Sequence, residues 1–304
     1  MSLFRRLQLA LGRRPRPIRS GRIFLAAGLA AAAATGDAGS TPPALPAAER
    51  AAWAASARAV LHGVVDRERS WTRIHAIEAL IRLGEGEGLR ARLEREQPEA
   101  DQSDYRIGAW RSRALLATDA VERARWIARI ESAYRDPASA DRLDAIETLA
   151  KLGHRIEGET RVLAQRQAEA LPAGDAVFPL WALAVAGDRP AFDRLVAALA
   201  SDDASARGRA AYALRWLGPT EPAVLTALAR AAEREPADSA AYPYVLGAAC
   251  RLEADPAAAA AWRARLEAVQ AGGPASASYE ASQALLARAS TADFPRLAPL
   301  LEHA

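Results

Sequence analysis

Residues Arg73–Gly84 read RIHAIEALIRLG, and close copies of this stretch return twice later in the chain. The copies are RLDAIETLAKLG at Arg142–Gly153 and RGRAAYALRWLG at Arg207–Gly218. Small or apolar residues fall at positions i, i+3, i+4 and i+7 of each copy, which is the spacing of an amphipathic α-helix. The closing glycine stands where a helix end requires a positive φ. Each copy therefore predicts a helix that ends at its glycine.

The same helix end recurs along the chain. With the residue before the closing glycine as anchor, the anchors fall at positions 83, 117, 152, 186, 217, 252 and 289, in steps of 31 to 37 residues. A second apolar segment follows each of the better glycines, for example Phe192–Leu199 and Val224–Ala232. The repeating unit is thus a helical hairpin, which cannot bury its apolar face alone but can do so in a stack.

The sequence predicts an all-α fold, a right-handed α-solenoid of about seven helical hairpins over residues 47–304. Residues 47–66 are expected to form an N-terminal capping helix, and residues 294–304 a short closing helix. Alanine makes up about a quarter of the 304 residues and favours helices, because its side chain loses no entropy in them. A single cysteine excludes a disulfide framework and a cysteine-based zinc site.

The positive net charge of +3 comes from the first 22 residues, which hold seven arginines and no acid. The rest of the chain has 33 basic and 37 acidic residues, and this acidic balance argues against a nucleic-acid partner. A run of 12 apolar residues follows at Ile23–Ala34, shorter than the roughly 20 that span a bilayer. Residues 1–34 therefore predict a signal-peptide-like leader, and the proline-rich residues 35–46 a linker.

Such a leader predicts a periplasmic or secreted protein, with cleavage after Ala34, Gly36 or Ala38. Two alternatives stay open. In one, an uncleaved leader anchors the chain to the membrane, which would be its only membrane contact. In the other, residues 1–34 are a basic tail followed by an alanine-rich helix.

The pattern Asp-x3-Arg-x2-Ala-x2-Ala-Leu-x2-Leu-Gly at Asp203–Gly218 resembles a HEAT repeat of the short bacterial, PBS-lyase-like kind. Residues Arg73–Gly84 and Asp136–Gly153 are similar to it. Tetratricopeptide repeats share the 34-residue step, but their Trp-x2-Leu-Gly-x2-Tyr run is absent. The resemblance implies a non-enzymatic scaffold or adaptor that binds a protein partner through the concave face of the solenoid.

Two other functions are compatible with the resemblance. Some HEAT-like proteins are bilin lyases or DNA glycosylases, so the chain could be an accessory subunit of such an enzyme. The segment Trp71–Leu80 also looks like HEAT segments of bacterial proteins associated with sodium/solute symporters, which would make the chain a membrane-tethered transporter accessory.

One stripe of the anchored helix, at positions −8, −5 and −1 from the anchor, changes character along the chain. It is charged in two copies, with His75, Glu78 and Arg82, and with Asp144, Glu147 and Lys151, and we expect these side chains to face water. Mid-chain it becomes aromatic, and exposed tryptophan and tyrosine are typical of binding surfaces. The predicted partner-binding residues are Phe178, Trp181, Tyr212, Trp216 and Tyr244, with Arg209 and Arg251 at the rim. The alternative is that these rings are ordinary core.

No catalytic, cofactor or metal site is predicted. His75 and Glu78 stand at i, i+3, but no further histidine or cysteine is placed to complete a metal site, so we interpret them as a solvated polar pair. Cys250 is expected to be a buried structural thiol. The recurring Arg73, Arg142 and Arg207 are expected to bind acids or carbonyls of a neighbouring unit.

Overall fold

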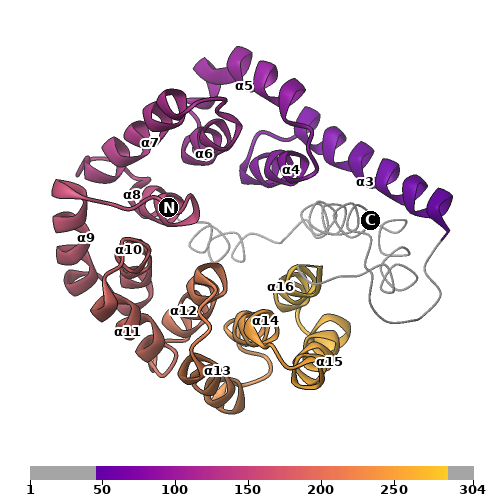
Figure 1. Ribbon diagram of the computed structural model, residues 1–304, viewed down its shortest axis with the longest axis vertical. Coiled ribbons are helices and arrows are strands. Elements are labelled where there is room, and N and C mark those ends of the chain that lie inside the picture. The colour runs from indigo at the N-terminus through magenta and orange to yellow at the C-terminus, as the bar shows by residue number, and fades with distance from the viewer. Residues whose placement is uncertain (1–45, 287–304) are drawn as a thin grey trace. The chain divides into compact units, whose positions relative to one another are not determined.

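The computed structural model describes residues 46–286, and this part of the chain contains 14 helices and no β-strand (Figure 1). The predicted all-α class is therefore confirmed. Residues 1–45 and 287–304 are not described, and they include the predicted leader, nearly all of the linker, the anchor at 289 and the closing helix at 294–304. No helix between residues 46 and 286 combines the length and apolar character that crossing a membrane requires.

The described chain divides into two compact units, with the division between Trp126 and Ile127. We call residues 46–126 the N-terminal unit and residues 127–285 the C-terminal unit. The N-terminal unit contains α3 (Ala47–Arg67), α4 (Trp71–Arg82), α5 (Gly86–Ala100), α6 (Arg106–Leu116) and the first turns of α7 (Ala120–Arg135). Within it, α4 contacts α3, α5 and α6. The predicted capping helix at 47–66 corresponds closely to α3.

The C-terminal unit continues from α7 with nine further helices. They are α8 (Arg142–Lys151), α9 (Gly158–Ala170), α10 (Ala173–Val185), α11 (Arg189–Ala198), α12 (Ala204–Leu217), α13 (Pro222–Arg234), α14 (Tyr242–Leu252), α15 (Pro256–Gly272) and α16 (Ala275–Leu286). Helices α8, α10, α12 and α14 form a row in which each contacts the next. Helices α9, α11, α13 and α15 lie along one side of this row (Figure 1).

The helices end where the repeated glycines predict. Gly84, Gly153, Gly187 and Gly218 all have positive φ, between 64° and 86°, and each lies just after a helix. Glycine adopts this conformation without the steric cost that a Cβ would bring. Anchor positions 83, 117, 152, 186, 217 and 252 each lie at the end of a helix.

Glycines within the row let its helices approach closely. A Cβ added at Gly208 of α12 would lie 3.2 Å from the Cα of Ala241, at the start of α14. A Cβ added at Gly247 of α14 would lie 2.8 Å from the Cβ of Ala284 in α16. Neighbouring backbones therefore come close enough for ring side chains to reach across from one helix to the next.

Each of the three recurring arginines binds a carboxylate or a carbonyl of the adjacent helix. Arg73 of α4 forms an ion pair with Glu96 of α5, and Arg207 of α12 forms one with Glu235 at the end of α13. The Nε of Arg142 in α8 donates a 2.9 Å hydrogen bond to the carbonyl of Tyr134 in α7. Charge-assisted bonds of this kind fix the angle between helices as well as stabilising them.

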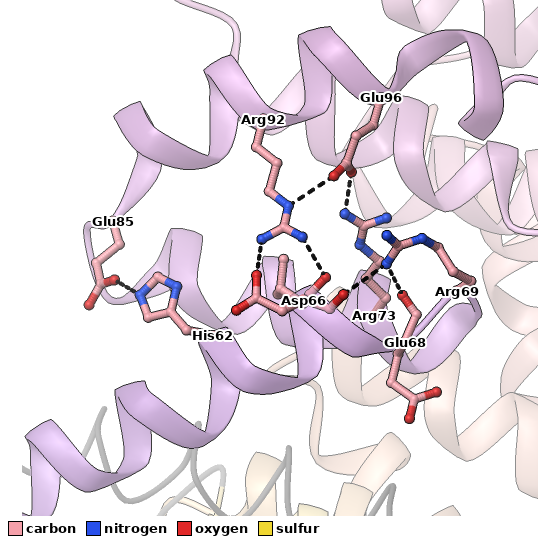
Figure 2. Close-up of polar contacts among 9 residues, drawn as sticks. His62, Asp66, Glu68, Arg69, Arg73, Glu85, Arg92 and Glu96 are labelled. Carbon is pink, nitrogen blue, oxygen red and sulfur yellow. Dashed lines mark hydrogen bonds and ion pairs between the residues drawn. The ribbon is translucent and has the colours of Figure 1, made fainter.

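A polar network holds α3 against α4 and α5 in the N-terminal unit (Figure 2). Arg92 of α5 lies at its centre, bonded to Asp66 of α3 and to Glu96 of its own helix. Arg73 of α4 shares the same Glu96. At the other end of the interface, Nε2 of His62 lies 2.5 Å from a carboxylate oxygen of Glu85. Helix α3 is thus attached by charged contacts as well as by its apolar face.

Candidate partner-binding site

The predicted aromatic stripe lies on three successive helices of the row in the C-terminal unit. Phe178 and Trp181 belong to α10, Tyr212 and Trp216 to α12, and Tyr244 to α14. Residues three or four apart on a helix lie on one face, so each helix presents its rings to the next. The stripe positions of α10, α12 and α14 therefore lie against one another.

Four of the five rings form one continuous group, which we call the aromatic cluster: Trp181, Tyr212, Trp216 and Tyr244. The centroid of Tyr212 lies 5.8 Å from that of Trp181, 6.3 Å from that of Trp216 and 6.2 Å from that of Tyr244. Trp181 and Trp216 are also 6.3 Å apart. The planes cross at 45° to 89°, the tilted and edge-to-face geometries that aromatic pairs prefer.

The cluster is exposed at Trp216 and buried at most of its other members. Trp216 is 42% exposed, whereas Phe178, Trp181 and Tyr244 are buried and Tyr212 is half-buried. The expectation that the whole stripe faces water is therefore wrong. The close approach of α10, α12 and α14 encloses the rings between helices, and Trp216 near the C-terminal end of α12 remains accessible.

The charged stripe is also less exposed than expected. Asp144 is buried, and Glu147 and Lys151 are half-buried and form an ion pair of 2.9 Å. Nζ of Lys151 lies over the ring of Tyr212, 5.3 Å from its centroid. The charged segment on α8 and the aromatic segment on α12 therefore meet in one place.

The two predicted rim arginines have different surroundings. Arg209 is buried, with its Nη1 2.5 Å from a carboxylate oxygen of Asp175 and its guanidinium over the ring of Phe178. Arg251 is exposed at the end of α14. Arg209 thus joins α12 to α10, and of the two only Arg251 has the exposure expected of a rim residue.

Three residues around the cluster are missing from the sequence prediction: Arg215, Tyr279 and Glu280. The guanidinium of Arg215 lies over the Tyr212 ring, 5.2 Å from its centroid. Glu280 of α16 faces Tyr244, which donates a hydrogen bond to it. The repeat unit that contains α16 matches the pattern poorly, so sequence spacing could not align Glu280 with the stripe.

Burial shifts the pKa values of Glu280 and Tyr244. It raises the pKa of Glu280, and the hydrogen bond from Tyr244 and the positive charges of Arg215 and Lys151 only partly oppose this. Burial also raises the pKa of Tyr244 well above its usual value, and the neighbouring Glu280 raises it further. The tyrosine is therefore a neutral hydrogen-bond donor, and the environment favours the neutral form of Glu280 more than water does.

The pair His75 and Glu78 lies in the N-terminal unit and is not the solvated pair that its spacing predicts. Nδ1 of His75 lies 3.8 Å from the Glu78 carboxylate, and Nε of Arg111 in α6 is 2.5 Å from the same carboxylate. Burial would raise the pKa of Glu78, but the charge of Arg111 and the contact with His75 lower it far below its usual range. Glu78 is half-buried and links α4 to α6.

Among the described residues, no group of three or more histidine, cysteine, aspartate or glutamate side chains could hold a metal ion. Cys250 is buried, as expected, with its sulfur 3.9 Å from the carbonyl oxygen of Ala259.

No protein family, no curated protein and no solved structure matches the sequence or fold of this chain.

Proposed function

We propose that this chain is a non-enzymatic scaffold of the HEAT-repeat type that is exported and binds a protein partner. Its helices would form a right-handed α-solenoid of about seven helical hairpins, in which the row of α8, α10, α12 and α14 lies on the concave, partner-binding side. The recurring helix ends and the contacts between alternate helices support this arrangement.

The observation that carries the proposal is the aromatic cluster with its exposed tryptophan. Tryptophan and tyrosine are enriched among the residues that dominate the binding energy of protein interfaces. The ring of Trp216 packs against the rings of Trp181 and Tyr212, so it is held in place in the free protein. Little side-chain entropy would then be lost on binding, which favours affinity.

The first test is site-specific photo-crosslinking from the mature chain. A benzophenone amino acid at position 216 is expected to capture a discrete partner from a periplasmic extract. The matched control is position 162, because Val162 is 46% exposed on α9 of the same unit and lies outside the cluster. Equal capture from both positions, or capture from position 162 alone, would contradict the proposed binding side.

The export part of the proposal has its own test. N-terminal sequencing of the protein recovered from the periplasmic fraction is expected to give a start after Ala34, Gly36 or Ala38. A chain that begins at Met1 and stays with the cytoplasmic fraction would contradict export. A chain that begins at Met1 in the membrane fraction would support the anchored alternative.

A further inference from the structure

Arg215 of α12 lies beside the aromatic cluster, with its guanidinium over the Tyr212 ring. Arg215 carries a guanidinium with five N–H donors and no acceptor. Between residues 46 and 286 no hydrogen bond or ion pair is found for Arg215; its guanidinium stacks on Tyr212, and its charge lowers the pKa of Glu280. By contrast, the two other arginines of α12, Arg207 and Arg209, are each bonded to a carboxylate.

The position of the Arg215 guanidinium is fixed by the helices around it. Its Nη1 would lie 3.4 Å from a Cβ added at Gly247 of α14, so the side chain extends along α14 at a point where no side chain intervenes. Stacking on Tyr212 orients the planar group from the other side. A preorganised arginine fork suits the two oxygens of a carboxylate, which it can bind through two parallel bonds.

The nearby charges also favour an anionic ligand over a cationic one. Lys151 lies over the same Tyr212 ring, but Glu147 balances its charge at 2.9 Å. The carboxyl group on which the charge of Arg215 acts is Glu280, and burial favours the neutral form of that group. The Tyr212 ring already has two cations within 5.3 Å, so a third would be repelled.

The carboxyl group of Glu280 lies near Arg215, and its surroundings reduce the repulsion that it would exert on a bound anion. Tyr244 donates a hydrogen bond to Glu280 from α14, Tyr279 adjoins it on α16, and the charges of Arg215 and Lys151 act on it from α12 and α8. Burial raises the pKa of Glu280, which makes the neutral form easier to reach when a second carboxylate binds nearby.

We propose that Arg215 binds a carboxylate of the protein partner while an apolar side chain next to that carboxylate lies against Trp216. The ligand class is thus an acidic peptide segment with a neighbouring apolar residue. This inference rests on the proposed function and specifies the chemistry of the same site.

The test uses a small probe that contains both features, 3-phenylpropionate, and a cationic analogue of similar shape, 3-phenylpropylamine. Binding is followed through the indole N–H resonance of Trp216 in the nitrogen-15-labelled mature chain, assigned with Trp216→Phe. The carboxylate is expected to shift this resonance with a Kd of about a millimolar, as suits a fragment of this size. The amine is expected to bind at least ten times more weakly.

Two arginine variants make the test specific. Arg215→Gln is expected to weaken probe binding at least tenfold, and Arg166→Gln, which changes an exposed arginine of α9, is expected to leave it unchanged. Equal binding of the two probes by the wild-type chain would overturn the inference, and this comparison needs no variant to fold. Unchanged probe binding by folded Arg215→Gln would also overturn it.

The proposed function and this inference fail in different ways. Loss of crosslinking specificity at position 216 contradicts the proposed function. If the chain binds the carboxylate probe selectively but captures no partner, the inference about the partner is overturned. If the chain captures a partner but does not distinguish the two probes, the inference fails and the proposed function stands.

Discussion

Arg207 binds the buried carboxylate of Glu235 through two nitrogens, Nε and Nη2, with Nη2 2.8 Å from Oε1. Ser239 donates a further hydrogen bond to the same carboxylate. Glu235 directly follows α13, and Arg207 lies in the first turn of α12. One ion pair therefore joins two helices of the C-terminal unit at their ends.

Removal of this arginine is expected to be costly. Arg207→Ala would leave Glu235 buried without its cation, and breaking a buried pair in this way costs about 3 kcal/mol. The measurement is the free energy of unfolding from urea denaturation. The matched control is Arg189→Ala, whose pairs with Asp193 and Glu221 are exposed and should contribute less than about 1 kcal/mol. Equal losses in the two variants would contradict this ranking.

The same pair makes part of the stability depend on pH. Burial alone would raise the pKa of Glu235, but the hydrogen bonds from Arg207 and Ser239 lower it below the usual value of 4.5. A carboxyl whose folded pKa is lowered adds stability above its unfolded pKa, and this contribution is lost as the pH falls through the folded value. We therefore expect the free-energy difference between wild type and Arg207→Ala to be largest above about pH 5 and to shrink toward pH 3. A difference that stays constant with pH would exclude this linkage.

Close contact at Gly247 leads to a prediction about packing. The Cβ introduced by Gly247→Ala would lie 2.8 Å from that of Ala284, so α14 and α16 must move apart. Overpacking of this kind costs about 1–3 kcal/mol. Gly272→Ala is the control, because nothing lies within 4 Å of the new Cβ. That change should be neutral or slightly stabilising, since alanine favours helix. Equal thermal stability of both variants would show that the contact relaxes freely.

Local features of this fold could be predicted from the sequence. The positive φ at Gly153 and Gly218 and the N-cap at Asp203 follow from residues adjacent in the chain. The sequence could predict that Arg207 binds an acid or a carbonyl, because an arginine recurs at its position in the repeat. Its partner Glu235 could not be predicted, because 28 residues separate the two and no spacing rule links them.

The exposure of the aromatic stripe could be predicted less well. Helical spacing correctly placed Trp181, Tyr212 and Tyr244 on facing sides of neighbouring helices. It could not determine that the helices come close enough to bury them, since that distance depends on small residues at the contacts between helices, such as Gly208 against Ala241. Glu280 was missed because α16 departs from the repeat pattern.

The difference in burial between Trp181 and Trp216 can be measured directly. Acrylamide quenching of tryptophan fluorescence is expected to lose a readily quenched component in Trp216→Phe, because Trp216 is 42% exposed. Trp181→Phe should keep that component, because Trp181 is 1% exposed. Trp181→Ala should also cost about 3–5 kcal/mol of stability as a core truncation, and Trp216→Ala much less. The reverse order of quenching or stability would contradict the burial described here.

Glu280 should make binding of the carboxylate probe depend on pH. A second carboxylate near Arg215 favours the protonated form of Glu280, so a proton is taken up on binding whenever Glu280 is ionised in the free protein. The affinity is therefore expected to fall as the pH rises through the pKa of Glu280, which burial raises above its usual value of 4.5. Glu280→Gln removes this titration while keeping the shape of the side chain. Its affinity for 3-phenylpropionate should vary less between pH 5 and 8 and should match or exceed that of the wild type at the upper end. A pH profile that is the same in both proteins would assign the dependence to another group and remove Glu280 from the site.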